Sequence, residues 1–512
     1  MKTIPSKEFL SCEKTNEQRQ PAKLNNNKLS NSMATSSRFS SVIQLTDLDD
    51  FITPSQECIK PAKTQNARQV TSSGSAKIQI GDDGSYSQLN KEGRPEKLQK
   101  AQITLNDCLA CSGCITSAES VLIGQQNHME FLKLCKDIEL SSPSRSFDKI
   151  VVGLSCQPIL SFANKFQIPP EEARAKLSTL FRQLGAAKVF DVESFSDLCL
   201  LECGQDFVHR YREQSTNSTS IPVLASACPG WICYAEKTHG NWILPHLSEV
   251  KSPQQIAGVL IKDVLPNELQ TSASRLAVVM IMPCFDKKLE ASRSDFFRDD
   301  QQSKDVDFVI TPVEIEQILE ELAIEFVDLS PSQIDSLGGT TDTSWSVPSG
   351  SGSGGYAEHV LRFAAKELYG MTLGHVKFQP LKNSDIREAF VEKDGEHVLS
   401  VAIVNGFRNI QNLVQKMKRK KRTYDYVEIM ACPSGCLNGG AQLRTELMET
   451  KTLTANMEAL HAKLEHRQVD DVRVNKLNHV WLGKASPEEH LNKLRTSYHA
   501  VQKSTNALTV KW

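Results

Sequence analysis

From about Asp148 onward, short apolar runs alternate with segments that have the periodicity of amphipathic helices. The runs are four to eight residues long and rich in Val, Ile, Leu and Met, which is typical of buried strands. They cover residues 149–155, 223–226, 276–282, 306–310, 401–404 and 426–430. This alternation predicts an α/β fold in which helices flank parallel sheets, arranged as two lobes.

Signals for helix ends lie between these runs. A helix is expected from about Pro169, with Leu177, Leu180, Phe181 and Leu184 on one face and Gly185 at its end. Residues 252–255 and 311–314 each combine a hydroxyl residue, a proline and a Glu or Gln at capping-box spacing. Each of these two segments therefore predicts a helix start.

A length of 512 residues allows about three domain-sized pieces. Residues 1–41 are rich in Ser, Asn, Gln and Lys and are expected to form a disordered arm. Residues 42–147 are predicted to form a small cysteine-bearing module, 148–440 the α/β core, and 441–512 a helical tail.

The charges nearly cancel, with 59 Lys and Arg against 61 Asp and Glu. This balance gives no electrostatic reason to expect a nucleic acid partner. No apolar run approaches the roughly 20 residues of a membrane span, and the first ten residues lack the apolar core of an export signal. The predicted location is the cytoplasm, with the nucleus as a second candidate. In that reducing setting, clustered cysteines among the 14 present indicate metal or redox chemistry.

Three cysteines, Cys108, Cys111 and Cys114, follow one another at C-x2-C-x2-C spacing. This spacing lets three thiolates of one tight loop reach three corners of a 4Fe-4S cubane. No cysteine follows at the position of a fourth local ligand, so that ligand must be remote, and the candidates are Cys12, Cys58 and Cys135. A zinc site is the alternative, although zinc modules more often use two separated C-x2-C pairs.

A second set of four cysteines is dispersed along the chain. Cys228 (in ASACPGW), Cys284 (in IMPCFDKKLE) and the pair Cys432 and Cys436 (in MACPSGCLNGG) each follow the end of a predicted strand. The carboxyl ends of parallel strands are where α/β folds bind ligands, so these thiolates are expected to converge on one buried site. A lone cysteine would be better explained as a small buried apolar residue, but the shared position after three strands, each with a following Pro or Gly, favours a common site.

These three segments resemble the cluster-binding motifs of iron-only hydrogenases. With LTDLDDFITPSQECIKP (45–61) and DCLACSGCITSAESVLI (107–123), they resemble the hydrogenase-like cytosolic iron-sulfur assembly factors, also called nuclear prelamin A recognition factor-like proteins. The resemblance spans about residues 45–512 and implies an iron-only hydrogenase-like fold with two 4Fe-4S clusters. It selects Cys58 to join Cys108, Cys111 and Cys114 at the first cluster. The second cluster would be held by Cys228, Cys284, Cys432 and Cys436.

The resemblance also implies a function in the cytosolic iron-sulfur protein assembly machinery. The protein would act as a carrier and adaptor between an NTPase scaffold complex and a targeting complex with a WD-repeat subunit, which matures apo iron-sulfur client proteins. The terminal Trp512 has two readings: it docks on its own domain, or it helps to recruit the targeting complex, as the family suggests.

One departure from the hydrogenase pattern argues against an enzyme. Hydrogenases place a proton-shuttle cysteine immediately before the first ligand of the second site, where this chain has Ala227. A methyl group cannot relay a proton, so no catalytic residue is predicted. Lys287 and Glu290 keep the hydrogenase spacing after Cys284 and are taken as supports of the loop. The alternative function is a hydrogenase-like redox enzyme or an electron-transfer protein.

Three further features have ordinary explanations. The cysteines Cys156, Cys199, Cys203 and Cys233 lie in no matching motif. The glycines at 350, 352 and 355 spell G-x-G-x-x-G, but no strand is predicted before them, so a flexible turn opening a helix near the second cluster is expected instead. The basic run at 416–422 fits a solvated helix end, with a docking patch for an acidic partner as the alternative.

Overall fold

The computed structural model describes residues 124–214, 221–337, 345–374, 376–421, 424–444, 450–469 and 487–500, the strand residues 78–80, 86–89 and 95–97, and the helical positions 474–475, 477 and 481. Among these residues, no helix combines the length and the apolarity that a membrane span requires. The segment up to residue 97 contributes a small antiparallel sheet of β1 (Ile78–Ile80), β2 (Tyr86–Leu89) and β3 (Pro95–Lys97).

A four-stranded parallel sheet forms the first lobe. Its strands run in the order β10 (Phe308–Ile310), β7 (Leu276–Ile281), β4 (Lys149–Leu154) and β5 (Ala186–Asp191). Alternate residues of β4 and β7 face two different apolar clusters, because side chains of a strand point to opposite faces. Both faces are therefore covered, which explains why β7 and the residues of β4 after Lys149 carry no polar side chain.

A five-stranded mixed sheet forms the second lobe. Its order is β12 (Gln379–Pro380), β13 (Ile386–Lys393), β14 (Glu396–Asn405), β15 (Tyr426–Met430) and β6 (Val223–Ala225). The strands β14, β15 and β6 are parallel, as predicted, whereas β12, β13 and β14 pair antiparallel. The sequence prediction missed β5 and the β13–β14 hairpin.

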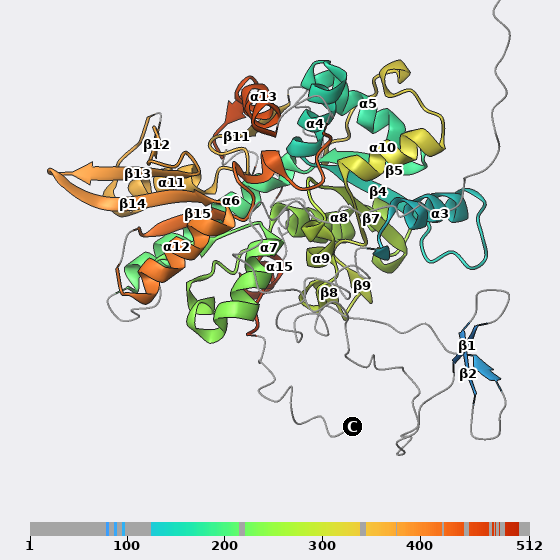
Figure 1. Cartoon of the computed structure of the whole chain (residues 1–512), viewed down its shortest axis with the longest axis horizontal. Helices are drawn as coiled ribbons and strands as arrows, with labels where there is room; N and C mark the ends of the chain where they lie inside the picture. The colour runs from blue at the N-terminus through green and yellow to red at the C-terminus, as the bar shows by residue number, and fades with distance from the viewer. Residues whose placement is uncertain are drawn as a thin grey trace, which may run out of the picture. The chain divides into compact units, whose positions relative to one another are not determined.

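The described α-helices surround these sheets (Figure 1). They are α3 (His128–Glu139), α4 (Cys156–Phe166), α5 (Pro170–Gln183), α6 (Glu193–Arg212), α7 (Pro229–Tyr234), α8 (Pro253–Glu268), α9 (Asp286–Ala291), α10 (Pro312–Glu321), α11 (Tyr356–Tyr369), α12 (Phe407–Lys418), α13 (Thr450–Ala462) and α15 (Pro487–Leu494). The helix α6 packs against both α8 and α11 in the larger apolar cluster, which also contains residues of β6, β14 and β15. The mixed α/β fold with parallel sheets is confirmed.

Two predicted helix starts have different outcomes. At α10, Thr311 and Glu314 form the expected capping box. The helix α8 also begins where predicted, but the Ser252 side chain makes no cap hydrogen bond and donates to Glu290 instead. The prediction of a capping box at 252–255 was therefore wrong, because the Ser252 hydroxyl forms a hydrogen bond with Glu290, which is distant in the sequence.

The glycine-rich turn opens α11, as expected. Gly355 is the N-cap residue with φ +74°, and a Cβ there would lie 2.1 Å from the Ser349 carbonyl oxygen, so only glycine fits. A short strand, β11 (Ser346–Pro348), does precede the turn and pairs in parallel with β16 (Glu465–Arg467). The expectation that no strand precedes it was therefore wrong.

The end of the described chain lies along the core. Val250 forms an antiparallel bridge with Arg495, and the Thr496 amide donates to the Glu249 carbonyl oxygen at 2.8 Å. The remaining short elements are the strand pair β8 (Phe297–Arg298) and β9 (Ser303–Lys304), the π-helical turn η3 (Ala235–His239), and the 3-10 turns η4 (Gly240–Trp242), η5 (Leu244–His246), η6 (Ala273–Arg275), η7 (Ser294–Phe296), η8 (Phe326–Asp328) and η10 (Gly435–Asn438).

Candidate metal centre

Four cysteines lie just beyond the carboxyl ends of three strands. Cys228 follows β6 and is the N-cap residue of α7. Cys284 lies between β7 and α9. Cys432 follows β15, and Cys436 lies in the turn η10. The predicted position of all four at strand ends is confirmed.

The topology explains how these strand ends meet. Strands β6 and β15 are parallel neighbours, so their carboxyl ends lie side by side. Strand β7 belongs to the other sheet, and its following loop is tied to the η10 loop by a 3.0 Å hydrogen bond from the Ala441 amide to the Pro283 carbonyl oxygen. A Cβ on Gly439 would lie 2.5 Å from that same oxygen, so only glycine allows the two loops to approach so closely.

The electrostatics of the thiols show that they share one environment. Burial, with smaller contributions from the nearby Asp286 and Cys436, raises the pKa of Cys228 to about 12. Burial also holds the pKa of Cys432 well above its ordinary value, with added contributions from Cys228, Cys284 and Cys436. The pKa of Cys284 is raised in the same way, first by burial and then by Asp286, Cys228 and Cys436.

These shifts have a chemical consequence. Thiols with raised pKa values stay protonated in the empty protein, and a metal centre must displace the protons to bind thiolates. Four sulfurs of this kind, two of them almost fully buried, form the donor set that iron-sulfur clusters use. Within the described residues, no three His, Cys, Asp or Glu side chains are grouped closely enough to hold a single metal ion. Around one tetrahedral zinc ion the sulfurs would lie within about 4 Å of one another.

Two serines orient the cysteine-bearing loops. The Cys228 amide donates to Ser226 Oγ at 3.0 Å, and the Cys436 amide donates to Ser353 Oγ at 2.9 Å. The hydrogen bond from Ser353 and the charge of Lys287 act against the burial that raises the pKa of Cys436. Ser353 belongs to the glycine-rich turn before α11, so the expected proximity of this turn to the second site is confirmed.

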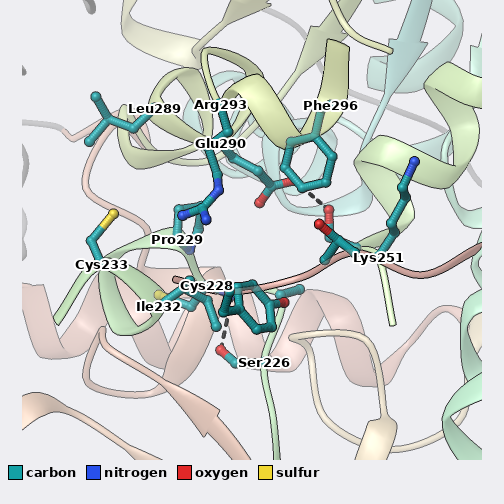
Figure 2. A pocket seen from close by; sticks show the side chains of 14 residues that line it. Ser226, Cys228, Pro229, Ile232, Cys233, Lys251, Leu289, Glu290, Arg293 and Phe296 are labelled. Carbon is teal, nitrogen blue, oxygen red and sulfur yellow. Dashed lines mark hydrogen bonds between the residues drawn. The ribbon is translucent and has the colours of Figure 1, made fainter. Parts of the chain in front are cut away.

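A small pocket of about 30 Å³ adjoins Cys228. Ala227, the residue before Cys228, also lines it. Figure 2 shows Glu290 and Arg293 reaching the pocket from one side and Ser226 and Cys228 from the other. Tyr498 also lines the pocket. Sequence analysis missed this residue, because nothing local in the sequence indicates that the tail returns to this place.

A polar cluster next to the pocket centres on Glu290. Its carboxylate accepts hydrogen bonds from Lys287 Nζ at 2.8 Å, from Gln255 Nε2 at 3.2 Å and from the Ser252 hydroxyl. Lys287 Nζ also lies 3.2 Å from Ser252 Oγ. Lys287 and Glu290 therefore form a buried pair that links α9 to α8, in agreement with their predicted role as supports.

The other predicted ligands, Cys58, Cys108, Cys111 and Cys114, lie outside the described residues, as do Cys12 and Trp512. Cys135, a further candidate for the remote ligand, is buried in the apolar cluster around Phe131, and this burial raises its pKa to about 12. The cysteines Cys156, Cys199 and Cys203 are buried in the apolar clusters.

Comparisons with known proteins agree with this geometry. Residues 148–440 match the family model described as the iron only hydrogenase large subunit, C-terminal domain. The cytosolic iron-sulfur assembly component 3 of Mus musculus is 47% identical over 480 residues, covering 93% of this chain and all of that protein. The chain belongs to the iron-only hydrogenase-like family of assembly factors. A probable cytosolic Fe-S cluster assembly factor of Anopheles gambiae is 49% identical over 488 residues. The match covers 93% of this chain and all of the Anopheles protein.

Solved structures extend the family relationship to hydrogenases. An FeFe-hydrogenase from a study of stepwise H-cluster assembly matches with a TM-score of 0.62 at 26% identity, covering 73% of this family member and 99% of that chain. The apo FeFe-hydrogenase of Chlamydomonas reinhardtii gives a TM-score of 0.63 at the same identity and coverage. The predicted hydrogenase-like fold is confirmed.

Proposed function

We propose that this protein is a component of the cytosolic iron-sulfur assembly machinery that carries two 4Fe-4S clusters. The observation that supports this most directly is the convergence of Cys228, Cys284, Cys432 and Cys436 at the edges of two sheets. The names of the relatives, which match over 93% of the chain, support the assembly role and the cytosolic location. Cys58, Cys108, Cys111 and Cys114 are proposed to hold the first cluster.

The proposed role is that of a carrier and adaptor. The second site is enclosed by α7, α9 and the η10 loop, which suits a cluster that stays bound. The first cluster, on a loop with one remote ligand, is the proposed cargo, received from an NTPase scaffold complex. A targeting complex with a WD-repeat subunit is the proposed recipient, recruited through Trp512.

Metal analysis of anaerobically purified protein tests the cofactor assignment. Two cubanes require roughly eight irons and eight sulfides per chain and give a brown protein that absorbs near about 400 nm. Cys432→Ala and Cys111→Ala should each remove about half of the iron. Cys156→Ala is the matched control, because Cys156 is equally buried but lies at the start of α4, and it should retain all of the iron. Zinc in place of iron, or iron loss from the control, would contradict the assignment.

The partner assignment has its own test. Removal of Trp512 should abolish co-purification of the protein with the targeting complex while the iron content stays the same. If the truncated chain still binds the complex, recruitment through Trp512 is wrong.

A hydrogenase-like redox enzyme remains the second candidate, since the solved structures that match are hydrogenases. Ala227 argues against it, because a methyl group beside Cys228 cannot pass a proton into the pocket. Hydrogen evolution with a reduced viologen dye distinguishes the two functions. The carrier hypothesis predicts none, and sustained turnover would establish the enzyme instead.

A further inference from the structure

A dense group of unpaired cations lies at the carboxyl end of α12. The five side chains are Lys416, Lys418, Arg419, Lys420 and Lys421, called the α12 basic patch below, and all five are exposed. Within the part of the chain that the structure describes, none of them forms an ion pair. Their charges add up to +5, whereas the whole chain carries −2, so the rest of the chain carries −7. The patch is therefore a concentration of positive charge in a chain that is otherwise net negative.

The helix end alone does not explain these charges. Cations favour the last turn of a helix because of its dipole, which accounts for Lys416 and Lys418. Lys420 and Lys421 lie beyond the helix. Lys420 also has φ +56°, in the left-handed region where glycine would close the same turn at lower cost. The turn therefore keeps a lysine where its backbone favours a residue without a side chain.

An exposed aromatic side chain lies next to the patch. Trp242, in the turn η4, is 39% exposed, and the Lys418 ammonium lies 5.5 Å from the centre of its ring. The rings of His239 and His246 each lie 6.2 Å from Trp242. Tryptophan is among the residues that most often dominate the binding energy of a protein interface.

The patch is also connected to the candidate metal centre. The helix α7 begins directly after Cys228 and ends at Tyr234. The Tyr234 ring packs edge-on against Phe407, the first residue of α12, with 5.3 Å between ring centres. Figure 1 shows α12 beside the segment that follows α7. A molecule bound at the patch would thus contact elements that adjoin the helix carrying Cys228.

We propose that the α12 basic patch and Trp242 form a docking site for an acidic segment of a partner protein, with an apolar side chain seated on Trp242. A short acidic segment can pair its carboxylates with the cations of the patch without extending beyond it. A longer nucleic acid would extend beyond the patch onto the rest of the chain, whose net charge is negative. The proposal is independent of which clusters the protein carries.

A binding assay with the full-length protein tests this proposal. The probe is a fluorescently labelled 12-residue peptide of Glu and Asp with one central Leu, and its anisotropy is measured at low and at physiological salt. The unsubstituted protein should bind it with an affinity that falls as salt rises. Replacing Lys416, Lys418, Lys420 and Lys421 with Glu should weaken binding by about 30-fold, as the sum of four exposed charge pairs. Trp242→Ala should weaken it by severalfold without removing the salt dependence.

A charge-matched variant provides the control. The control carries Glu at four other exposed lysines, namely Lys133 and Lys136 in α3, Lys451 in α13 and Lys463 just after α13. These substitutions change the net charge of the protein by the same amount as those in the patch. This variant should bind the peptide nearly as well as the unsubstituted protein. Equal weakening in both variants, no peptide binding, or tighter patch-dependent binding of a 12-nucleotide single-stranded DNA would each overturn the proposal. Far-UV circular dichroism verifies that both variants are folded.

Discussion

The Arg293 guanidinium forms a two-bond ion pair with the Glu236 carboxylate, at 2.9 Å and 2.7 Å, and both side chains are almost completely buried. Arg293 lies just after α9, the helix that follows the Cys284 loop, and Glu236 lies in the turn η3 after α7, so the pair joins these two segments. Although burial acts in the opposite direction, the hydrogen bonds and charge of Glu236 hold the pKa of Arg293 above its ordinary value. The Arg293 guanidinium therefore stays charged, and the pair ties together two segments near the candidate metal centre.

Breaking this pair should destabilise the protein strongly. Arg293→Met leaves the Glu236 carboxylate buried without its partner, which should lower the free energy of unfolding by about 3–5 kcal/mol. Urea unfolding of the anaerobically purified protein measures this change. Arg145→Ala is the control, because its pair with Asp148 is partly exposed and should contribute less than about 1 kcal/mol. Similar losses in the two variants would contradict the assigned role.

Gly439→Ala should damage the metal centre without removing a ligand. The added methyl group would lie 2.5 Å from the Pro283 carbonyl oxygen and push apart the loops of Cys284 and Cys436. We expect loss of up to half of the iron and a cost of about 1–3 kcal/mol in stability. Gly124→Ala, where no atom lies within 4 Å of the new Cβ, should change neither. Full iron content in Gly439→Ala would show that the loops can move apart freely.

His461 should make stability depend on pH. Burial, together with the nearby His466, lowers the pKa of His461 to about 4 in the folded protein, whereas the unfolded value is about 6.5. Its neutral form is favoured by the fold, so the contribution is complete above pH 6.5 and is lost as the pH falls toward 4. The expected loss is about 3 kcal/mol. In His461→Phe the fall in unfolding free energy between pH 6.5 and 4 should be smaller, and an unchanged slope would refute this assignment.

Tyr498→Ala should open the pocket beside Cys228. The tyrosine lines this pocket, and the Arg293 guanidinium lies 5.8 Å from its ring centre. We expect an iron chelator to remove metal severalfold faster from the variant, because the path from solvent to Cys228 becomes shorter. Ser497→Ala, at an exposed neighbour, is the control. If both variants lose iron at the same rate, the tail does not protect the centre.

Local sequence signals predicted the core elements well. Strand β15 has the predicted bounds, and β4 and β7 end within one residue of them. β7 is apolar at every position and β4 carries only Lys149 as a charged residue, because both faces of their sheet are covered, and β15 is buried at every position although it contains Glu428. The β13–β14 hairpin was missed because charged residues dominate β13, although Asp394 and Gly395, both at positive φ, supply a typical hairpin turn.

Ser252 is a residue whose hydrogen bond could not be predicted from its neighbours in the sequence. Its spacing from Gln255 matches a capping box, but its hydroxyl donates to Glu290, 38 residues away in the chain. A capping rule considers only neighbours in sequence, and it expects Ser252 Oγ to accept a hydrogen bond from the Gln255 amide. In the structure that amide donates to the Ser252 carbonyl oxygen at 3.0 Å, and the Ser252 side chain turns to the buried Glu290 carboxylate. Such departures are expected at functional sites.

The sequence by itself determined which sulfurs are available and that each follows a strand, because strand periodicity and cysteine position are local properties. Only the tertiary structure decided that the loop after β7, from one sheet, meets the ends of β6 and β15, from the other. The tail at Tyr498 and the turn at Ser353 also reach this site only through the fold. These contacts join residues that are far apart in the chain. They result from packing between the lobes, and such packing leaves no periodic signal in the sequence.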